Sequence, residues 1–170
     1  MNEKLQKYIP RDDIYLFNTG NAQKAWLSFG CHYISKIKMH RFLVWAPNAR
    51  KVSLVGDFNN WDRNATPMDP VEGGVWIVFV EGLKHGDLYK YCIDGADGRQ
   101  VLKADPFAAW SQTDKETASK VFSRSRARWT DKEYMEKRAA RKFMQEPMSV
   151  YEMHIGSWKD LPGEEPVYRE

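Results

Sequence analysis

Apolar and polar residues alternate in short runs through the middle of the chain, and turn residues separate these runs. Four runs are expected to be β-strands: residues 41–46, 51–56, 74–80 and 87–94. Residues 101–102 and 119–122 are candidates for two more, with the polar run from Ser111 to Thr117 in a loop between them. Short strands at this spacing are typical of an antiparallel β-sandwich.

Both ends of the chain have different patterns. In residues 1–30, Asp12 fits the start of a short helix that stops at Gly20, and a second short helix is expected before Gly30. Thr130 to Glu133 fits a capping box, in which two side chains satisfy the first free amides of a helix. This helix should run to about residue 144 as a charged, solvated connector.

Residues 148–158 return to a strand pattern with an apolar majority. The polar residues 159–170, which include two prolines, offer no strand to pair with it. An unpaired apolar strand leaves backbone donors and acceptors exposed and invites aggregation. We therefore expect this strand to have neighbours in a longer protein.

These patterns predict a mainly β fold, an immunoglobulin-like antiparallel β-sandwich with short N-terminal helices and a C-terminal helix and strand extension. A chain of 170 residues is long enough for one well-formed core. The expected organisation is a helical segment at 1–30, the sandwich at 31–123, a helical linker at 124–147 and a further strand segment at 148–170.

Composition and charge narrow the classes of function. Aromatic residues make up 14% of the chain, and such residues often line carbohydrate or peptide sites. The net charge is only +3 and the basic residues are dispersed, which argues against nucleic-acid binding. Cys31 and Cys92 lie far apart, and the chain has no signal peptide and no long apolar run, so we expect a cytoplasmic protein without membrane contact.

No catalytic constellation is apparent in the sequence. No serine lies in a nucleophile-elbow motif, and no pair of carboxylates stands out for glycoside chemistry. Cysteine partners at metal-ligand spacing are lacking for the scattered histidines, which are His32, His40, His85 and His154. We therefore expect no catalytic residue, no metal site and no cofactor in this chain.

Binding is better supported, by the stretch from Gly56 to Trp61. Asp and Asn form fixed turns and tolerate left-handed backbone, and the alternation before them does not require the large ring that follows. A sugar site needs a flat aromatic ring, short amides and a cation; Trp61, Asn59 and Asn60 supply the first two, and Lys90 could supply the third. Alternatively, the ring closes the core, the amides only make the turn and the lysine is merely solvated.

Five motifs follow one another in the chain: FLVWAPNA at 42–49, VGDFNNW at 55–61, GDLYKY at 86–91, KADP at 103–106 and SVYEMHIGSW at 149–158. In this order they resemble the N-terminal part of bacterial 1,4-α-glucan (glycogen) branching enzymes. The resemblance implies a carbohydrate-binding module of the isoamylase N-terminal type, followed by the first strand, 150–155, of an α-amylase-superfamily (β/α) barrel. The segment 148–170 would then begin that barrel domain.

The resemblance also implies a chemistry that lies outside this chain. The family cleaves an α-1,4 linkage, holds the severed glucan on an aspartate and transfers it to a 6-hydroxyl. Its aspartate nucleophile and glutamate acid/base have no matching position here, so the chain alone is expected to be inactive. The implied partners are α-1,4-glucan or glycogen and the enzyme's own barrel domain.

The related glycogen-binding modules of kinase regulatory subunits resemble this chain at single positions. Their stacking aromatic matches Trp61, their strand lysine matches Lys90, and their Thr-x-Asn segment falls on Thr117 and Ser119. They carry a second tryptophan where this chain has the run from Ala96 to Arg99. One of two stacking rings is therefore absent, which predicts weak glucan binding.

Three functions are compatible with these observations. The first is the glucan-positioning module of a glycogen branching enzyme, and the second is a stand-alone glycogen-targeting adaptor of the kinase-subunit kind. The third is a structural spacer without a glucan site. The barrel-entry motif at 151–158 favours the first, because an adaptor has no use for it.

Overall fold

The computed structural model describes residues 3–113, 115–123 and 129–154. The chain divides into two compact units, Met1–Ser125 and Arg126–Glu170. The helical elements of the first unit are α1 (Glu3–Gln6), α2 (Arg11–Asn18) and the 3-10 helices η1 (Ala25–Leu27), η2 (Asp57–Asn59) and η3 (Glu72–Gly74). Its strands are β1 (Gly30–Ile34), β2 (Met39–Trp45), β3 (Ala49–Gly56), β4 (Asp69–Pro70), β5 (Val75–Glu81), β6 (Leu88–Gly95), β7 (Gln100–Lys103) and β8 (Ser119–Lys120).

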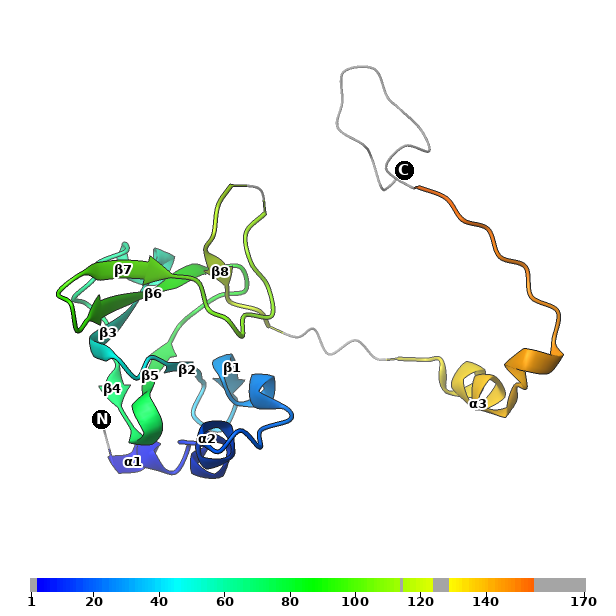
Figure 1. Cartoon of the computed structure of the whole chain (residues 1–170), viewed down its shortest axis with the longest axis horizontal. Coiled ribbons are helices and arrows are strands. Elements are labelled where there is room, and N and C mark those ends of the chain that lie inside the picture. The colour runs from blue at the N-terminus through cyan, green and yellow to red at the C-terminus, as the bar shows by residue number, and fades with distance from the viewer. Residues whose placement is uncertain (1–2, 114, 124–128, 155–170) are drawn as a thin grey trace, which may run out of the picture. The chain divides into compact units, whose positions relative to one another are not determined.

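These strands form two antiparallel sheets (Figure 1). Sheet A has the order β1-β2-β5-β4, and sheet B has the order β3-β6-β7, with β8 also pairing with β6. Side chains from both sheets meet in one buried cluster that includes Phe42, Val44, Leu54 and Tyr91. The predicted mainly β sandwich is therefore confirmed.

Strand β2 is buried on both of its faces. Phe42 and Val44 belong to the cluster between the sheets, whereas Leu43 belongs to a second cluster with Ile14 of α2 and Phe29. Alternate residues of a strand point to opposite faces. Sheet A thus lies between sheet B and the N-terminal helices, as Figure 1 shows.

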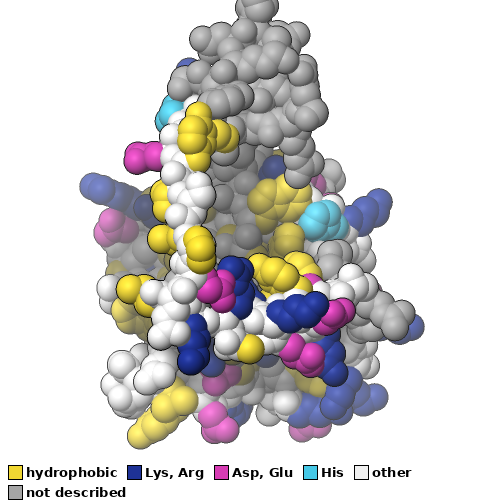
Figure 2. Space-filling view, turned by 90° about the vertical axis from the view of Figure 1, so that its right-hand side faces the viewer, with side chains coloured by type: hydrophobic (Ala, Val, Ile, Leu, Met, Phe, Trp, Pro, Cys, Tyr) yellow, Lys and Arg dark blue, Asp and Glu magenta, His cyan; other side chains and the backbone are white. Residues whose placement is uncertain are grey.

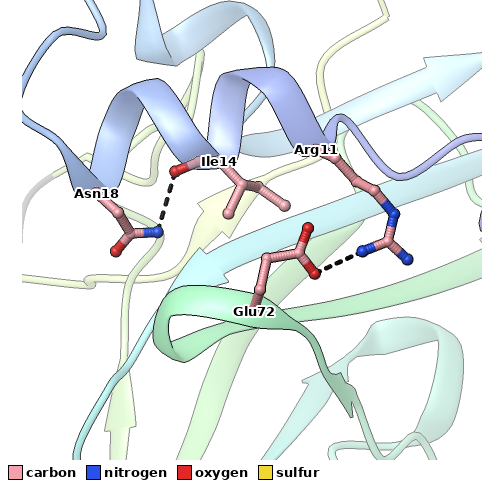
Figure 3. Close-up of polar contacts among 4 residues, drawn as sticks. All are labelled: Arg11, Ile14, Asn18 and Glu72. Carbon is pink, nitrogen blue, oxygen red and sulfur yellow. Dashed lines mark hydrogen bonds and ion pairs between the residues drawn. The ribbon is translucent and has the colours of Figure 1, made fainter.

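Helix α2 contacts the turn at η3 through polar groups (Figure 3). Arg11 Nη1 lies 2.7 Å from Glu72 Oε2 of η3. Within α2, the Asn18 side-chain amide donates to the carbonyl oxygen of Ile14 at 3.0 Å. A Cβ added at Gly73, where φ is 69°, would lie 2.0 Å from Asn18 Nδ2. Only glycine allows this close approach.

The buried side chain of Arg41 joins the N-terminal segment to sheet A. Its Nη1 donates to the carbonyl oxygen of Tyr8 at 3.1 Å, and its Nη2 donates to the carbonyl oxygen of Ser28 at 3.0 Å. Because a buried guanidinium needs such partners, these contacts fix the segment before β1 against the sheet.

Four predicted strands correspond to β2, β3, β5 and β6, and the two candidates correspond to β7 and β8. Two strands were not expected, β1 and the two-residue β4. The sequence of β1 lacks a clean alternation, and only its pairing with β2, from Gly30 opposite Leu43 to Ile34 opposite Met39, makes it a strand.

The second unit contains α3 (Lys132–Ala140) and the 3-10 helix η4 (Phe143–Gln145). The expected capping box does not form, because Asp131 takes the N-cap position and makes no side-chain capping bond. Glu133 instead pairs with Lys137 at 2.7 Å. The strand expected at 148–158 is not present in its described part, 148–154, where no strand partner pairs with it; residues 155–158 lie outside the described residues.

Candidate functional site: the outer face of sheet B

The turn that follows β3 is built from residues with special backbone requirements. A Cβ added at Gly56 would lie 2.2 Å from the carbonyl oxygen of Leu88, so no larger residue fits. After η2, Asn60 and Trp61 both have positive φ, 53° and 60°. Asn tolerates this region, whereas a bulky ring residue there is strained. Such strain is concentrated at functional sites.

The side chain of Asn59 holds this turn together. Its Oδ1 accepts from the amide of Gly56 at 2.9 Å, and its Nδ2 donates to the carbonyl oxygen of Leu54 at 2.9 Å and to Thr66 Oγ1 at 3.0 Å. These bonds occupy the Asn59 amide within the protein. Asn60 is exposed beside it.

The ring of Trp61 is fixed to strand β6 through the carboxylate of Asp57. Trp61 Nε1 donates to Asp57 Oδ1 at 3.1 Å, and the backbone amide of Leu88 donates to Asp57 Oδ2 at 2.9 Å. Trp61 is partly buried and belongs to neither core cluster. Sequence reasoning missed Asp57 as a site residue, although its spacing of four from Trp61 is the signal that could have found it.

Lys90 and Thr117, which lie 27 residues apart, meet on the same side of sheet B. Lys90 Nζ donates to Thr117 Oγ1 at 2.8 Å. The neighbours of Lys90 in β6, Tyr89 and Tyr91, point into the core, so Lys90 projects from the outer face.

Ser119 does not join the other predicted site residues. Its side chain is 1% exposed, and its Oγ accepts from the backbone amide of Asp105 at 2.9 Å. It pairs with the core residue Tyr89 and therefore points inward. The expected sugar contact of Ser119 is corrected on this ground: a hydroxyl buried in the core cannot reach a ligand on the surface.

The segment after Trp61 crosses the outer face of sheet B. Lys51 Nζ donates to Asn64 Oδ1 at 3.0 Å, and Arg63 Nη1 donates to the side-chain oxygen of Gln100 on β7. Val55, the register partner of Lys90, is fully buried although it lies outside both core clusters. The turn and this segment thus leave only part of the outer face open to ligands.

A buried polar cluster lies on the other side of sheet B. Asp105 Oδ2 accepts from the hydroxyls of Tyr89 at 2.7 Å and Tyr91 at 3.2 Å. Burial raises the pKa of the Asp105 carboxyl and the pKa values of both tyrosines, and it also raises the pKa of the nearby Cys31 thiol. The cluster is enclosed, so it connects β6 to the 105–107 segment rather than serving a ligand.

Charge and metal-binding groups add little to the site. Figure 2 shows Lys and Arg side chains interspersed with Asp and Glu side chains among the described residues of the face in view. Cys31 and Cys92 are free thiols. In the parts of the chain that the structure describes, no group of three or more His, Cys, Asp or Glu side chains could hold a metal ion.

Sheet B, the turn that follows β3 and the segment before β8 thus carry an anchored indole, an exposed amide, an ammonium group and a hydroxyl. An indole can stack on the C–H face of a sugar, and the polar groups can bond to its hydroxyls. These groups are of the types that a sugar-binding site uses.

Comparison with known proteins identifies similar sequences. Residues 28–108 match the family model of carbohydrate-binding module 48, the isoamylase N-terminal domain. The chain is 39% identical over 157 residues to 1,4-alpha-glucan branching enzyme GlgB 1 of Clostridium perfringens, covering 90% of this chain and 23% of that relative. It is 44% identical over 162 residues to GlgB of Rubrobacter xylanophilus, covering 93% of this chain and 22% of the relative. The resemblance that the sequence motifs indicate is confirmed.

Two solved structures have a similar fold. A putative alpha amylase from Salmonella typhimurium is 25% identical, with a TM-score of 0.51 over 63% of this chain and 17% of that one. Pullulanase type I from Bacillus subtilis, complexed with maltose, is 26% identical, with a TM-score of 0.51 over 61% of this chain and 14% of that one. The present chain thus spans less than a quarter of the length of these two relatives and of these two structures.

Within the described residues, no helix is both long enough and apolar enough to cross a membrane.

Proposed function

We propose that the outer face of sheet B binds α-1,4-glucan. In this proposal Trp61 stacks on a glucose ring, Lys90 and Thr117 bond to its hydroxyls, and Asn60 lies at the edge of the site. Asn59 and Asp57 are positioning residues, because their side chains hold the turn and the indole. We assign no sugar contact to Ser119.

The contact between Lys90 and Thr117 carries this proposal. Their 2.8 Å hydrogen bond brings together two sugar-binding candidates from distant parts of the chain, on the strand to which Asp57 anchors Trp61. A purely structural lysine on a sheet face needs no such arrangement. This hydrogen bond orients the Lys90 ammonium group and the Thr117 hydroxyl. Each of them can replace it with a hydrogen bond to a sugar hydroxyl.

The chain would thereby serve as the glucan-positioning module of a cytoplasmic 1,4-α-glucan branching enzyme, which forms α-1,6 branches in glycogen synthesis. Relatives that are themselves named branching enzymes support this role over a stand-alone adaptor. The catalytic groups would lie in a barrel domain, and the present chain alone should introduce no branches into amylose. Measurable branching by this chain would contradict that division of labour.

The proposal includes a contact with that barrel domain. Exposed hydrophobic side chains gather around a groove of about 470 Å³, lined among others by Trp26, Leu27, Tyr33 and Phe122. We assign the contact to this groove because burying exposed apolar surface drives association between domains. Leu27→Asp should lower the melting temperature of an intact branching enzyme that carries this module, and should change that of the module alone much less.

Calorimetric titration with maltoheptaose tests the glucan site. The wild type should bind, and Trp61→Ala and Lys90→Ala should each lower the affinity about tenfold, equal to about 1.4 kcal/mol. Trp129→Ala is the matched control, because Trp129 is an exposed tryptophan of the second unit. If the wild type does not bind, or if Trp61→Ala binds as well as Trp129→Ala, the module is a spacer or binds glucan elsewhere.

A further inference from the structure

The segment that begins at Trp110 extends sheet B beyond β8. The backbone amide of Lys120 donates to the carbonyl oxygen of Trp110 at 2.9 Å, and the amide of Gln112 donates to that of Ala118 at 2.8 Å. Ser111 pairs with Ser119 between these two bonds. Residues 110–112 therefore lie alongside β8 as an additional antiparallel segment at the edge of sheet B. The polar run in the sequence does not predict this pairing.

The register places Trp110 on the outer face. Residues opposite each other in a ladder share a face, and successive residues alternate between faces. Ser119 is opposite Tyr89 and points into the core, so Lys120 and its partner Leu88 point outward. Trp110 lies opposite Lys120 and shares its side: Lys120 Nζ is 4.5 Å from the centroid of the Trp110 ring.

Trp61 and Trp110 consequently flank the same end of β6. Asp57 anchors the Trp61 ring on the β3 side of Leu88, and Trp110 lies two strands away on the β8 side. Adjacent strands are about 4.8 Å apart, so the backbone of Trp110 lies about 10 Å across the sheet from Leu88. The strip between the two indoles carries Leu88 and Lys120, both partly exposed.

The Trp110 ring is held in place but remains accessible. The His85 ring stacks on it at a centroid distance of 5.0 Å and an interplanar angle of 26°, and Phe122 meets it edge-on at 6.5 Å. Trp110 is nevertheless 38% exposed. A ring that is oriented before the ligand arrives loses little freedom on binding. The Lys120 ammonium makes only a weak cation–π contact at an exposed site, so a sugar can displace it.

We propose that Trp110 is a second stacking residue of the glucan site and that Lys120 donates hydrogen bonds to glucan hydroxyls beside it. A chain of α-1,4-linked glucose units long enough to reach from Trp61 to Trp110 then contacts both indoles. The inference rests on the proposed function at Trp61. It adds a preference for longer glucans, because a short one reaches only one ring.

Calorimetry with maltotriose and maltoheptaose tests this inference. The wild type should bind maltoheptaose more tightly than maltotriose, and Trp110→Ala should lower maltoheptaose affinity about tenfold while changing maltotriose affinity less than about twofold. Lys120→Met keeps the apolar stem and should lower maltoheptaose affinity about threefold, which provides a readout if Trp110→Ala folds poorly. Trp129→Ala is again the control.

The outcomes separate the two proposals. If Trp61→Ala loses binding while Trp110→Ala and Lys120→Met retain the wild-type preference for maltoheptaose, the second contact is wrong and the glucan site at Trp61 stands. If the wild type binds neither oligosaccharide, the glucan site itself is wrong and the second contact falls with it. Loss of maltoheptaose affinity in either Trp110→Ala or Lys120→Met, with maltotriose affinity kept, supports the inference.

Discussion

Asp57 holds the indole of Trp61 through a 3.1 Å hydrogen bond from Nε1 to Oδ1, and its other carboxylate oxygen accepts the backbone amide of Leu88 at 2.9 Å. One side chain thus fixes both the ring and the strand that carries Lys90. Because this carboxylate connects two parts of the proposed site, its removal should affect binding even though it stacks on no sugar.

Replacing Asp57 by Ala should therefore weaken maltoheptaose binding about tenfold, since a free indole must be ordered again on binding. The measurement is calorimetry, supported by tryptophan fluorescence as a report on ring mobility. Asp97→Ala, in an exposed turn, is the control. Unchanged affinity in Asp57→Ala would mean that the Trp61 ring needs no anchor or takes no part in binding.

Asn59 and Asn60 should behave differently, although they are neighbours of the same type. Asn59→Ala removes three hydrogen bonds and should lower the free energy of unfolding by about 2 to 3 kcal/mol in urea titrations. Asn60→Gly suits the left-handed backbone and should change stability by less than about 0.5 kcal/mol. Reduced glucan affinity in Asn60→Gly would then identify a sugar contact, and unchanged affinity would leave Asn60 with the turn alone.

The close contact between α2 and η3 predicts a large effect at one glycine and a small one at another. Gly73 and Gly82 both have positive φ, but a Cβ meets Asn18 at Gly73 and nothing within 4 Å at Gly82. Gly82→Ala should lower the free energy of unfolding by about 1 kcal/mol through backbone strain alone. Gly73→Ala should lower the free energy of unfolding by at least about 1 kcal/mol more than Gly82→Ala does. Equal losses of stability in the two variants, measured by chemical denaturation, would contradict the packing of α2 on sheet A.

The buried carboxyl of Asp105 predicts a pH dependence of stability. Burial raises its pKa in the folded state, so the folded protein holds this proton more tightly than the unfolded chain does. Its contribution is fully present below the unfolded pKa of about 3.9, and it is lost as the pH rises through the higher folded pKa.

Urea unfolding of the wild type and Asp105→Asn across this pH range measures that contribution. As the pH rises through this range, the free energy of unfolding of the wild type should fall relative to that of the variant. The fall should be about 1.4 kcal/mol for each unit by which the folded pKa exceeds the unfolded pKa. Asp97→Asn should follow the wild type. A constant difference between the wild type and Asp105→Asn at all pH values would show that the folded and unfolded pKa values are equal.

The sandwich could be predicted from the sequence because its central strands alternate clearly, as Tyr89, Lys90 and Tyr91 do. The turn-forming role of residues such as Asn59 could also be predicted. Strand β1 could not be predicted, because its pairing with β2 and not its own pattern defines it.

The positions of Ser119 and Trp110 depend in the same way on pairing between distant segments. Ser119 is buried because it pairs with the core residue Tyr89, which is 30 residues earlier in the chain, and its Oγ accepts from the amide of Asp105. The position of Trp110 could not be predicted because the polar run after it resembles a loop, and its backbone pairing with the β8 segment places it on the sheet. Motif order indicated the family, whereas side-chain direction depended on contacts between distant segments.

Nuclear magnetic resonance of the tryptophan indole N–H groups, with maltoheptaose added stepwise to the ¹⁵N-labelled wild type, tests the central claim most directly. Trp45 and Trp76 are internal references, because their Nε1 groups donate to the carbonyl oxygens of Gly73 and Ala46. We expect a saturable shift of the Trp61 signal while the two reference signals stay in place. A Trp61 signal that does not move while the protein binds maltoheptaose, or a protein that does not bind it, would contradict a glucan site on the outer face of sheet B.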